Sequence, residues 1–336
     1  MPLISSAYAG PPRWQFNGHL QTIAPNVLRQ VAPVAYRRHQ LELSDGDFLD
    51  LDFSFMQGGR GMLIIGHGLE GSADRPYVRG MTRAAAAAGF QVCAINFRSC
   101  SGRLNRLARM YHHGDYPDLR EVIEFLRKQN NLPLHYVGFS MGGNIGLNLA
   151  ARDADFAATT LSSVVAFSSP LDLGDSIASL DTTLGKVYSR RFWLALGQKL
   201  RAKAAHHPIE NLEVLDQLGD WDAFDRAYTL PLHGYDDEAV PRNFYDDVSP
   251  VRFLDQVEAR TLIVQALNDP MLGGRCYETA FAKTNDNITL EHPAEGGHVG
   301  FAERSARGTY IESRTIEFIT SAGSTPKLSS IDRRLA

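Results

Sequence analysis

Short apolar runs alternate with helical patterns along much of the chain, and this alternation limits the folds available to it. Runs typical of buried strands occur at 62–68, 90–97, 134–139, 162–169 and 261–267. Helical patterns such as PYVRGMTRAAAAAG and DLREVIEFLRKQN separate the first four runs. This spacing predicts an α/β fold with a mostly parallel, doubly wound sheet and flanking helices.

Two further regions add strands to the predicted sheet. Residues 36–55 show apolar alternation around SDGD, which predicts a hairpin with an Asp-Gly turn. The run ITLEHP at 288–293 is typical of one more short strand. We therefore expect about eight strands in a single domain that spans residues 1–336.

The stretch from about residue 171 to about residue 251 interrupts the alternation. It contains helical segments and lies between two predicted strands, so it must leave and rejoin the carboxyl edge of the sheet, where α/β proteins bind ligands. We expect an inserted helical cap there. Its aromatic residues, including Trp193, Tyr228 and Phe244, indicate either an apolar acyl pocket or ordinary packing. The polar stretch from about 322 to 336 is expected to be a flexible tail.

Composition and charge argue against several classes of function. The net charge is −4 without a long basic run, so we expect no binding to nucleic acid or to an anionic membrane. We find no transmembrane segment of roughly 18 apolar residues and no signal peptide. The three cysteines form no CxxC pair, so we expect no disulfide framework, no metal site and no cofactor. A cytoplasmic protein of unknown oligomeric state is expected.

Residues 137–144, VGFSMGGN, place Ser140 between Gly138 and Gly142. The pattern Gly-x-Ser-x-Gly arises by chance in about one chain in ten of this length. Here, however, it follows a predicted strand and precedes a helical pattern, which is typical of a nucleophile elbow. Such a turn strains the serine backbone and needs glycine where other chain segments approach closely. The alternative is that Ser140 only caps the following helix.

A serine nucleophile needs a base and an acid that orients the base, and in this type of sheet the acid precedes the histidine. His298, in the Gly-rich loop AEGGHVGF, is the candidate base, whereas His292 is expected to be structural. Asp269 follows a strand and precedes a proline that holds it in an extended conformation, so it is the candidate acid. Asp172, after the preceding strand, is its rival.

Two backbone amides are candidates for an oxyanion hole. One belongs to Met141, directly after the serine. The other belongs to Leu69 in the segment HGLEGS, where Gly68 permits close approach of the backbone. His67 precedes the serine in the chain, so we expect it to brace this loop and not to act as the base.

Three other histidine-containing segments have no chemistry that the sequence assigns. The pairs His112-His113 and His206-His207 lack a carboxylate at a recognised metal-ligand spacing. His19, in NGHLQTI, is expected to pack in the core or to brace a loop.

Seven segments together resemble a known family. They are PPRWQFNGHLQTIAP (11–25), HGLEGS (67–72), NFRSCSGRLNRLARMYHHGD (96–115), GFSMGGN (138–144), YTLPLHGYDDEAVPRNFYDDVSP (228–250), ALNDPML (266–272) and EGGHVGF (295–301). The chain is identified as a member of the α/β-hydrolase fold superfamily and resembles, specifically, its YheT-like, embryogenesis-associated-protein type. NGHLQTI together with HGLEGS separates this type from other hydrolases.

The resemblance implies a serine hydrolase with Ser140 as nucleophile, Asp269 as acid and His298 as base, which coincides with the choices made from the residues. It also implies an ester or lipid-ester substrate. The chain departs from the family pattern at Ser99, where glycine is usual, and at Met141, where leucine is common. The first departure is expected to alter a loop near the site.

We therefore expect a serine esterase that cleaves carboxylic esters of small molecules or lipids through an acyl-enzyme, with short to medium acyl chains favoured. An acyltransferase, a lipid-ester lipase, or an amidase or peptidase would use the same machinery. A non-catalytic ligand-binding protein with this fold is the alternative from another class.

Overall fold

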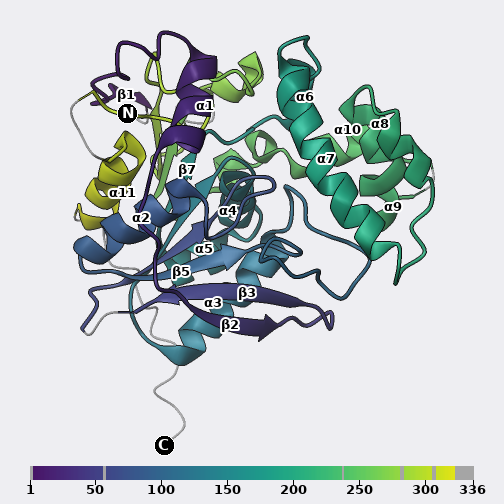
Figure 1. Cartoon of the computed structure of the whole chain (residues 1–336). Helices are drawn as coiled ribbons and strands as arrows, with labels where there is room; N and C mark the ends of the chain where they lie inside the picture. Colours follow the sequence, from purple (N-terminus) through teal and green to yellow (C-terminus); the bar gives the residue numbers. More distant parts are fainter. Residues whose placement is uncertain (1–2, 56–57, 237, 281–283, 305–307, 322–336) are drawn as a thin grey trace, which may run out of the picture.

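The centre of the molecule is a nine-stranded sheet in the order β1-β9-β8-β7-β6-β4-β5-β3-β2 (Figure 1). The computed structural model describes residues 3–55, 58–236, 238–280, 284–304 and 308–321. Strand β3 is antiparallel to β2 and β5, whereas the other paired strands are parallel. The expected mostly parallel α/β sheet is confirmed. The strands are β1 (Leu3–Ile4), β2 (Arg37–Glu42), β3 (Phe48–Ser54), β4 (Met62–Gly66), β5 (Gln91–Asn96), β6 (Leu134–Phe139), β7 (Leu161–Phe167), β8 (Thr261–Val264) and β9 (Ile288–Glu291).

One strand more than the expected eight lies at the edge of the sheet. Strand β1 has two residues and pairs in parallel with β9, Leu3 opposite Leu290. Both β1 residues are exposed, so the strand has no alternation of apolar and polar residues that a sequence could display. The predicted hairpin is present as β2 and β3, and the two strands pair from Arg37 opposite Phe53 to Glu42 opposite Phe48.

Helices cover both faces of the sheet because its central strands are apolar on both sides. In β4, Leu63 and Ile65 belong to one core cluster, while Met62 and Ile64 belong to the other. The helices on the first face are α1 (Gly18–Leu28), α2 (Pro76–Ala87) and α11 (Tyr310–Thr320), and those on the second face are α3 (Tyr116–Gln129), α4 (Met141–Arg152) and α5 (Ala154–Thr160).

The regular elements described between β7 and β8 are all helices, and they group together beside the sheet (Figure 1). They are α6 (Leu173–Leu180), α7 (Gly185–Lys203), η1 (Leu212–Asp216), α8 (Trp221–Phe224), the π-helix η2 (Asp225–Thr229), α9 (Leu230–Leu232), α10 (Pro241–Val248), η3 (Pro250–Arg252) and η4 (Leu254–Gln256). In the described part of the chain no helix is long and apolar enough to cross a bilayer. The tail expected at about 322–336 lies outside the described residues.

The loop between β5 and α3 is held by the buried side chain of Arg98, which is 2 % exposed. Its guanidinium contacts Asp118 at the start of α3 at 2.7 Å and Asp47 in the hairpin at 2.8 Å. Burial costs this group less because paired carboxylates surround it. The adjacent Ser99 has a φ of 62°, a left-handed conformation that favours glycine, and its hydroxyl donates to Asn105 Oδ1 at 2.6 Å. This conformation suits the glycine that the family resemblance implies at this position.

Candidate active site

Ser140 lies in a strained turn between β6 and α4. Its φ is 54° and its ψ is −120°, and its hydroxyl makes no capping hydrogen bond to the helix that it precedes. A Cβ on Gly138 would meet the backbone of Gly142, and a Cβ on Gly142 would meet the backbone of Gly66, in each case closer than 3.0 Å. The two glycines are therefore required by close backbone packing, and the capping alternative for the serine hydroxyl is wrong.

The structure brings Ser140, His298 and Asp269 together from three separate loops. Ser140 Oγ lies 2.9 Å from His298 Nε2, and His298 Nδ1 lies 2.8 Å from Asp269 Oδ2. The histidine and the aspartate are buried, and the Met271 amide donates to the second carboxylate oxygen at 2.9 Å. This geometry is that of a hydroxyl, a base that can accept its proton, and a carboxylate that orients the base.

The rival residues occupy other positions. Asp172 caps α6 by accepting from the Asp175 amide at 2.9 Å, and its other oxygen pairs with Arg275 at 3.1 Å. His292 packs its ring edge against Tyr277, with the two centroids 5.7 Å apart, and burial lowers the pKa of His292. Neither side chain contacts Ser140 or His298 among the interactions of the described residues.

The two candidate oxyanion amides lie near the serine. Met141 is the first residue of α4, and the first amides of a helix have no intrahelical partner. Leu69 follows β4 and lines the same cavity as Ser140 and His298. A Cβ on Gly68 would lie 3.2 Å from the Cβ of Ser140, so the glycine lets this loop approach the serine closely.

The segment NGHLQTI positions the loops that carry the acid and the base. The buried Gln21 accepts at Oε1 from Asn268 Nδ2 and from the Gly296 amide, both at 2.8 Å. Thr22 Oγ1 accepts from the His298 amide, also at 2.8 Å. Sequence reasoning missed both residues, because the segment has no chemical signature and is more than 240 positions away from its partners. His19, expected to pack in the core or to brace a loop, lies in α1, and its Nδ1 is 2.8 Å from the hydroxyl of Tyr188 in α7.

His67 braces the loop after β4, as its position in the chain indicated. Its Nδ1 donates to the Gly68 carbonyl at 2.7 Å, and its Nε2 accepts from the Phe97 amide at 3.2 Å. Both ring nitrogens are therefore occupied in the neutral form. Burial lowers the pKa of His67 to about 3.

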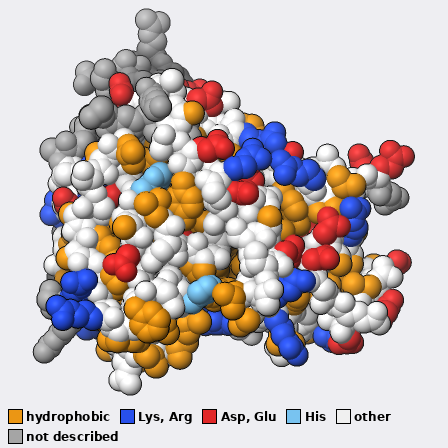
Figure 2. Space-filling view, turned by 90° about the horizontal axis from the view of Figure 1, so that it is seen from above, with side chains coloured by type: hydrophobic (Ala, Val, Ile, Leu, Met, Phe, Trp, Pro, Cys, Tyr) orange, Lys and Arg blue, Asp and Glu red, His pale blue; other side chains and the backbone are white. Residues whose placement is uncertain are grey.

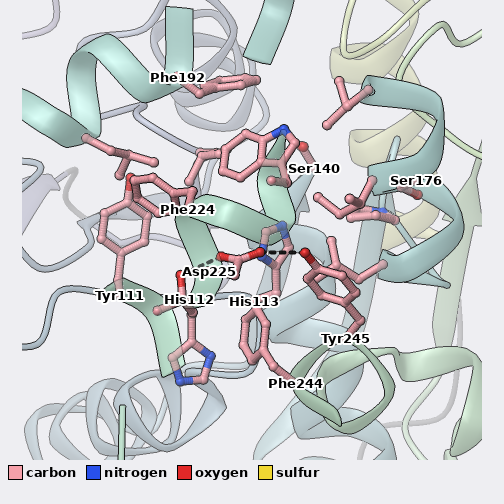
Figure 3. A pocket seen from close by; sticks show the side chains of 18 of the residues that line it. Tyr111, His112, His113, Ser140, Ser176, Phe192, Phe224, Asp225, Phe244 and Tyr245 are labelled. Atoms are coloured by element: carbon pink, nitrogen blue, oxygen red, sulfur yellow. Dashed lines mark hydrogen bonds between the residues drawn. The ribbon is translucent and has the colours of Figure 1, made fainter. Parts of the chain in front are cut away.

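A cavity with about 920 Å³ of space, part of it open to solvent, extends from Ser140 and His298 beneath the helices that follow β7 (Figure 3). Most of its lining is apolar and aromatic. Tyr228 and Phe244, two of the aromatic residues for which a pocket or packing was predicted, are among its lining residues. Trp193 is not among the lining residues and packs against Trp221 with ring centroids 5.7 Å apart, so its role is packing. The described residues contain no group of three or more His, Cys, Asp or Glu side chains that could hold a metal ion.

Comparisons with known proteins agree with this fold. A sequence model of the alpha/beta hydrolase fold family matches residues 61–305. The chain is an α/β hydrolase: it belongs to that family, and its similarity to YheT confirms the more specific resemblance. It is 31% identical to YheT of Escherichia coli (strain K12), with 94% of each protein covered.

Two further proteins extend the comparison. The chain is 25% identical to mouse phospholipase ABHD3, with 90% of this chain and 75% of the relative covered. The esterase Pf2001 of Pyrococcus furiosus has the same fold, with a TM-score of 0.55, 14% identity, and 88% of this chain and 96% of that structure covered.

We expect Gln21→Leu to lower kcat about 10- to 100-fold, because the loops that carry Asp269 and His298 lose their shared hydrogen bonds. Stability is expected to fall as well, since the Gly296 amide is left unpaired. The measurement is kcat and KM for a chromogenic ester together with urea unfolding. Asn26→Ala is the control, because within the described residues its side chain bonds to a carbonyl of the same helix and to neither loop. A Gln21→Leu protein with reduced stability but wild-type kcat would contradict the positioning role.

We expect the free energy of unfolding to fall as the pH drops from 6.5 toward 3, in part because of His67. The unfolded chain binds a proton at this residue near pH 6.5, whereas the folded chain binds it only near pH 3. Urea unfolding at several pH values gives the free energy of unfolding as a function of pH. In this window His67→Gln should lower the slope of that free energy against pH by about 1.4 kcal/mol per pH unit. Parallel curves for wild type and His67→Gln would rule out this contribution.

Proposed function

We propose that the protein hydrolyses carboxylic esters through an acyl-enzyme formed on Ser140. The observation that carries the proposal is the pair of contacts at His298, 2.9 Å from Ser140 Oγ on one side and 2.8 Å from Asp269 Oδ2 on the other. A hydroxyl becomes an effective nucleophile only when a base accepts its proton, and this arrangement supplies that base.

In the proposed mechanism, His298 Nε2 takes the Ser140 proton as Oγ attacks the ester carbonyl. The tetrahedral intermediate collapses, the bond to the alcohol breaks, and His298 returns the proton to the leaving alkoxide. A water molecule, deprotonated by His298, then attacks the acyl-enzyme. The bond between the acyl carbon and Ser140 Oγ breaks, His298 returns the proton to Oγ, and the carboxylic acid leaves. Asp269 holds the imidazole in the tautomer with a proton on Nδ1 and stabilises the imidazolium that forms.

We assign oxyanion stabilisation to the amides of Leu69 and Met141. An amide at the start of α4 also benefits from the positive end of the helix dipole, which favours negative charge on the carbonyl oxygen. We further assign the role of a cap to the segment of about 171–251. Its residues, such as Ile177 and Phe224, supply much of the wall of the cavity that would receive the acyl chain.

A lipid-ester lipase is the second candidate, and exposed apolar side chains support it. In α1, Ile23 is 46 % and Val27 is 66 % exposed, and both line a second cavity that also reaches Ser140 and His298. Hydrophobic side chains gather over part of the face seen from above (Figure 2). The mouse relative is named a phospholipase. Highest kcat/KM on long-chain esters would favour this candidate over a short- to medium-chain esterase.

We expect Ser140→Ala to lower kcat for p-nitrophenyl esters by roughly three to six orders of magnitude, because no other group replaces the nucleophile. The measurement covers acyl chains from C2 to C16. The wild-type protein should also be labelled at Ser140 by a fluorophosphonate probe, whereas the variant should not. Ser179→Ala, on the cap helix α6, is the matched control. Wild-type turnover by Ser140→Ala would contradict the proposal.

We expect Asp269→Asn to lower kcat by about 10⁴-fold, because the amide no longer selects the productive tautomer of His298. Asp172→Asn should lower kcat by less than about tenfold, since Asp172 caps α6 and does not contact the imidazole. Steady-state kinetics of both variants on one ester distinguishes the two acids. Similar losses in the two variants would contradict the assignment of Asp269.

A further inference from the structure

One part of the cavity wall is polar, although most of the lining is apolar. The apolar part includes Leu173, Ile177, Phe192, Leu196 and Trp221. The polar end consists of His112, His113, Asp225, His233 and Tyr245, from the loop before α3 and from three elements of the cap. Buried polar groups are costly unless they are hydrogen-bonded, so their presence beside an apolar chamber calls for a reason.

These polar side chains form one contiguous surface. The rings of His112 and His233 lie 4.4 Å apart between centroids, and those of His112 and Phe244 lie 5.5 Å apart. Phe244 in turn packs against Tyr245, whose hydroxyl donates to Asp225 Oδ2 at 2.7 Å. Figure 3 shows the Asp225 carboxyl and the Tyr245 hydroxyl turned toward each other within the cavity.

Asp225 begins the π-helix η2, a form of helix found often at functional sites. Thr229 Oγ1 donates to its Oδ1 at 2.5 Å, and Tyr245 donates to its Oδ2. A carboxyl group has about four lone-pair sites, so two protein donors leave capacity for a ligand hydroxyl. Asp225 is only 5 % exposed, and burial raises its pKa to about 6.

His113 and His233 retain free hydrogen-bonding capacity. Within the described residues neither ring has a hydrogen-bond partner, whereas His112 accepts from the Gly114 amide at 2.9 Å and lies 3.3 Å from Asp115. Burial lowers the pKa of His113 and of His233 to about 3, so both are neutral. Each neutral imidazole offers one donor and one acceptor to a group that enters the cavity.

We infer that this polar end binds an uncharged hydroxyl group on the acyl part of the substrate, an inference that rests on the proposed esterase function. The preferred substrates are then esters of hydroxylated acyl groups, with the hydroxyl placed against His113, His233, Asp225 and Tyr245. The apolar wall holds the hydrocarbon part of the same acyl group. A hydroxyl can donate to one member of this surface and accept from another.

The charges that face this surface argue against an anionic group. A substrate carboxylate would meet Asp225 and Asp115. The guanidinium of Arg109, whose charge acts on His112 and His233, is already paired with Asp115 at 3.0 Å and with Asp118 at 3.4 Å. Neutral histidines cannot supply the missing positive charge. A buried anion with no counterion would lose its hydration without compensation. An uncharged group does not incur that cost.

The test uses p-nitrophenyl esters in matched sets of equal acyl length, from C4 to C10. Each set contains a plain ester, its ω-hydroxy form, its ω-carboxy form and its ω-amino form. At one or more lengths we expect kcat/KM for the hydroxy ester to exceed that of the plain ester by about tenfold, as one or two added hydrogen bonds would produce. The carboxy and amino esters should be poorer than the hydroxy ester.

Two variants locate the effect. In His113→Phe and in Tyr245→Phe the ratio of kcat/KM for hydroxy over plain ester should fall toward one. Tyr228→Phe is the matched control, because Tyr228 lines the same cavity but its hydroxyl donates to the Asn211 carbonyl at 2.5 Å, and there the wild-type ratio should remain. Fluorophosphonate labelling of Ser140 verifies that each variant is folded.

The inference is overturned if wild type shows no preference for any hydroxy ester over its plain counterpart, if a charged ester is the best substrate, or if the ratio persists in both variants. Failure of the esterase function looks different, because wild type would then neither hydrolyse the plain esters nor react with the fluorophosphonate probe.

Discussion

The close contact between the β6–α4 turn and the neighbouring strand β4 is the constraint on which the rest of the site depends. Gly138 and Gly142 have no room for a side chain, and the backbone packing that excludes one holds Ser140 at a φ of 54°. Such a conformation costs about 1–3 kcal/mol and persists only where the surroundings over-determine it. Here a sheet buried on both faces does so, and the turn leaves the serine hydroxyl free of capping.

The candidate base and the candidate acid depend on a second long-range interaction. Asp269 and His298 follow neighbouring parallel strands, β8 and β9, so both loops emerge at the same edge of the sheet. Helix α1 then joins these loops through Gln21 and Thr22. Side chains on loops are not held in place by regular secondary structure. Hydrogen bonds between the loops therefore fix the distances between these side chains.

Residues of the segment 171–251 divide the cavity by polarity. Its apolar wall matches what the aromatic residues of the segment suggested, although Trp193 proved to pack behind that wall. Its polar end was not foreseeable, because His113, Asp225 and Tyr245 are separated by more than 100 positions between the first and the last. Burial keeps His113 and His233 neutral. The low polarity that would suit an acyl chain therefore also determines which polar groups can bind there.

The sequence alone was enough to predict the strand–helix alternation and the need for glycine beside the serine, because both depend on residues that are near one another. It was also enough to predict the order of Ser140, Asp269 and His298, because that order follows from the direction of the chain through a parallel sheet. Which groups meet across loops depended on the tertiary structure. The contact between His298 and Asp269 agrees with the choice of Asp269 over Asp172 made from the sequence. The support from Gln21 and the polar end of the cavity arise from contacts between distant segments, and no periodicity in a sequence records such contacts.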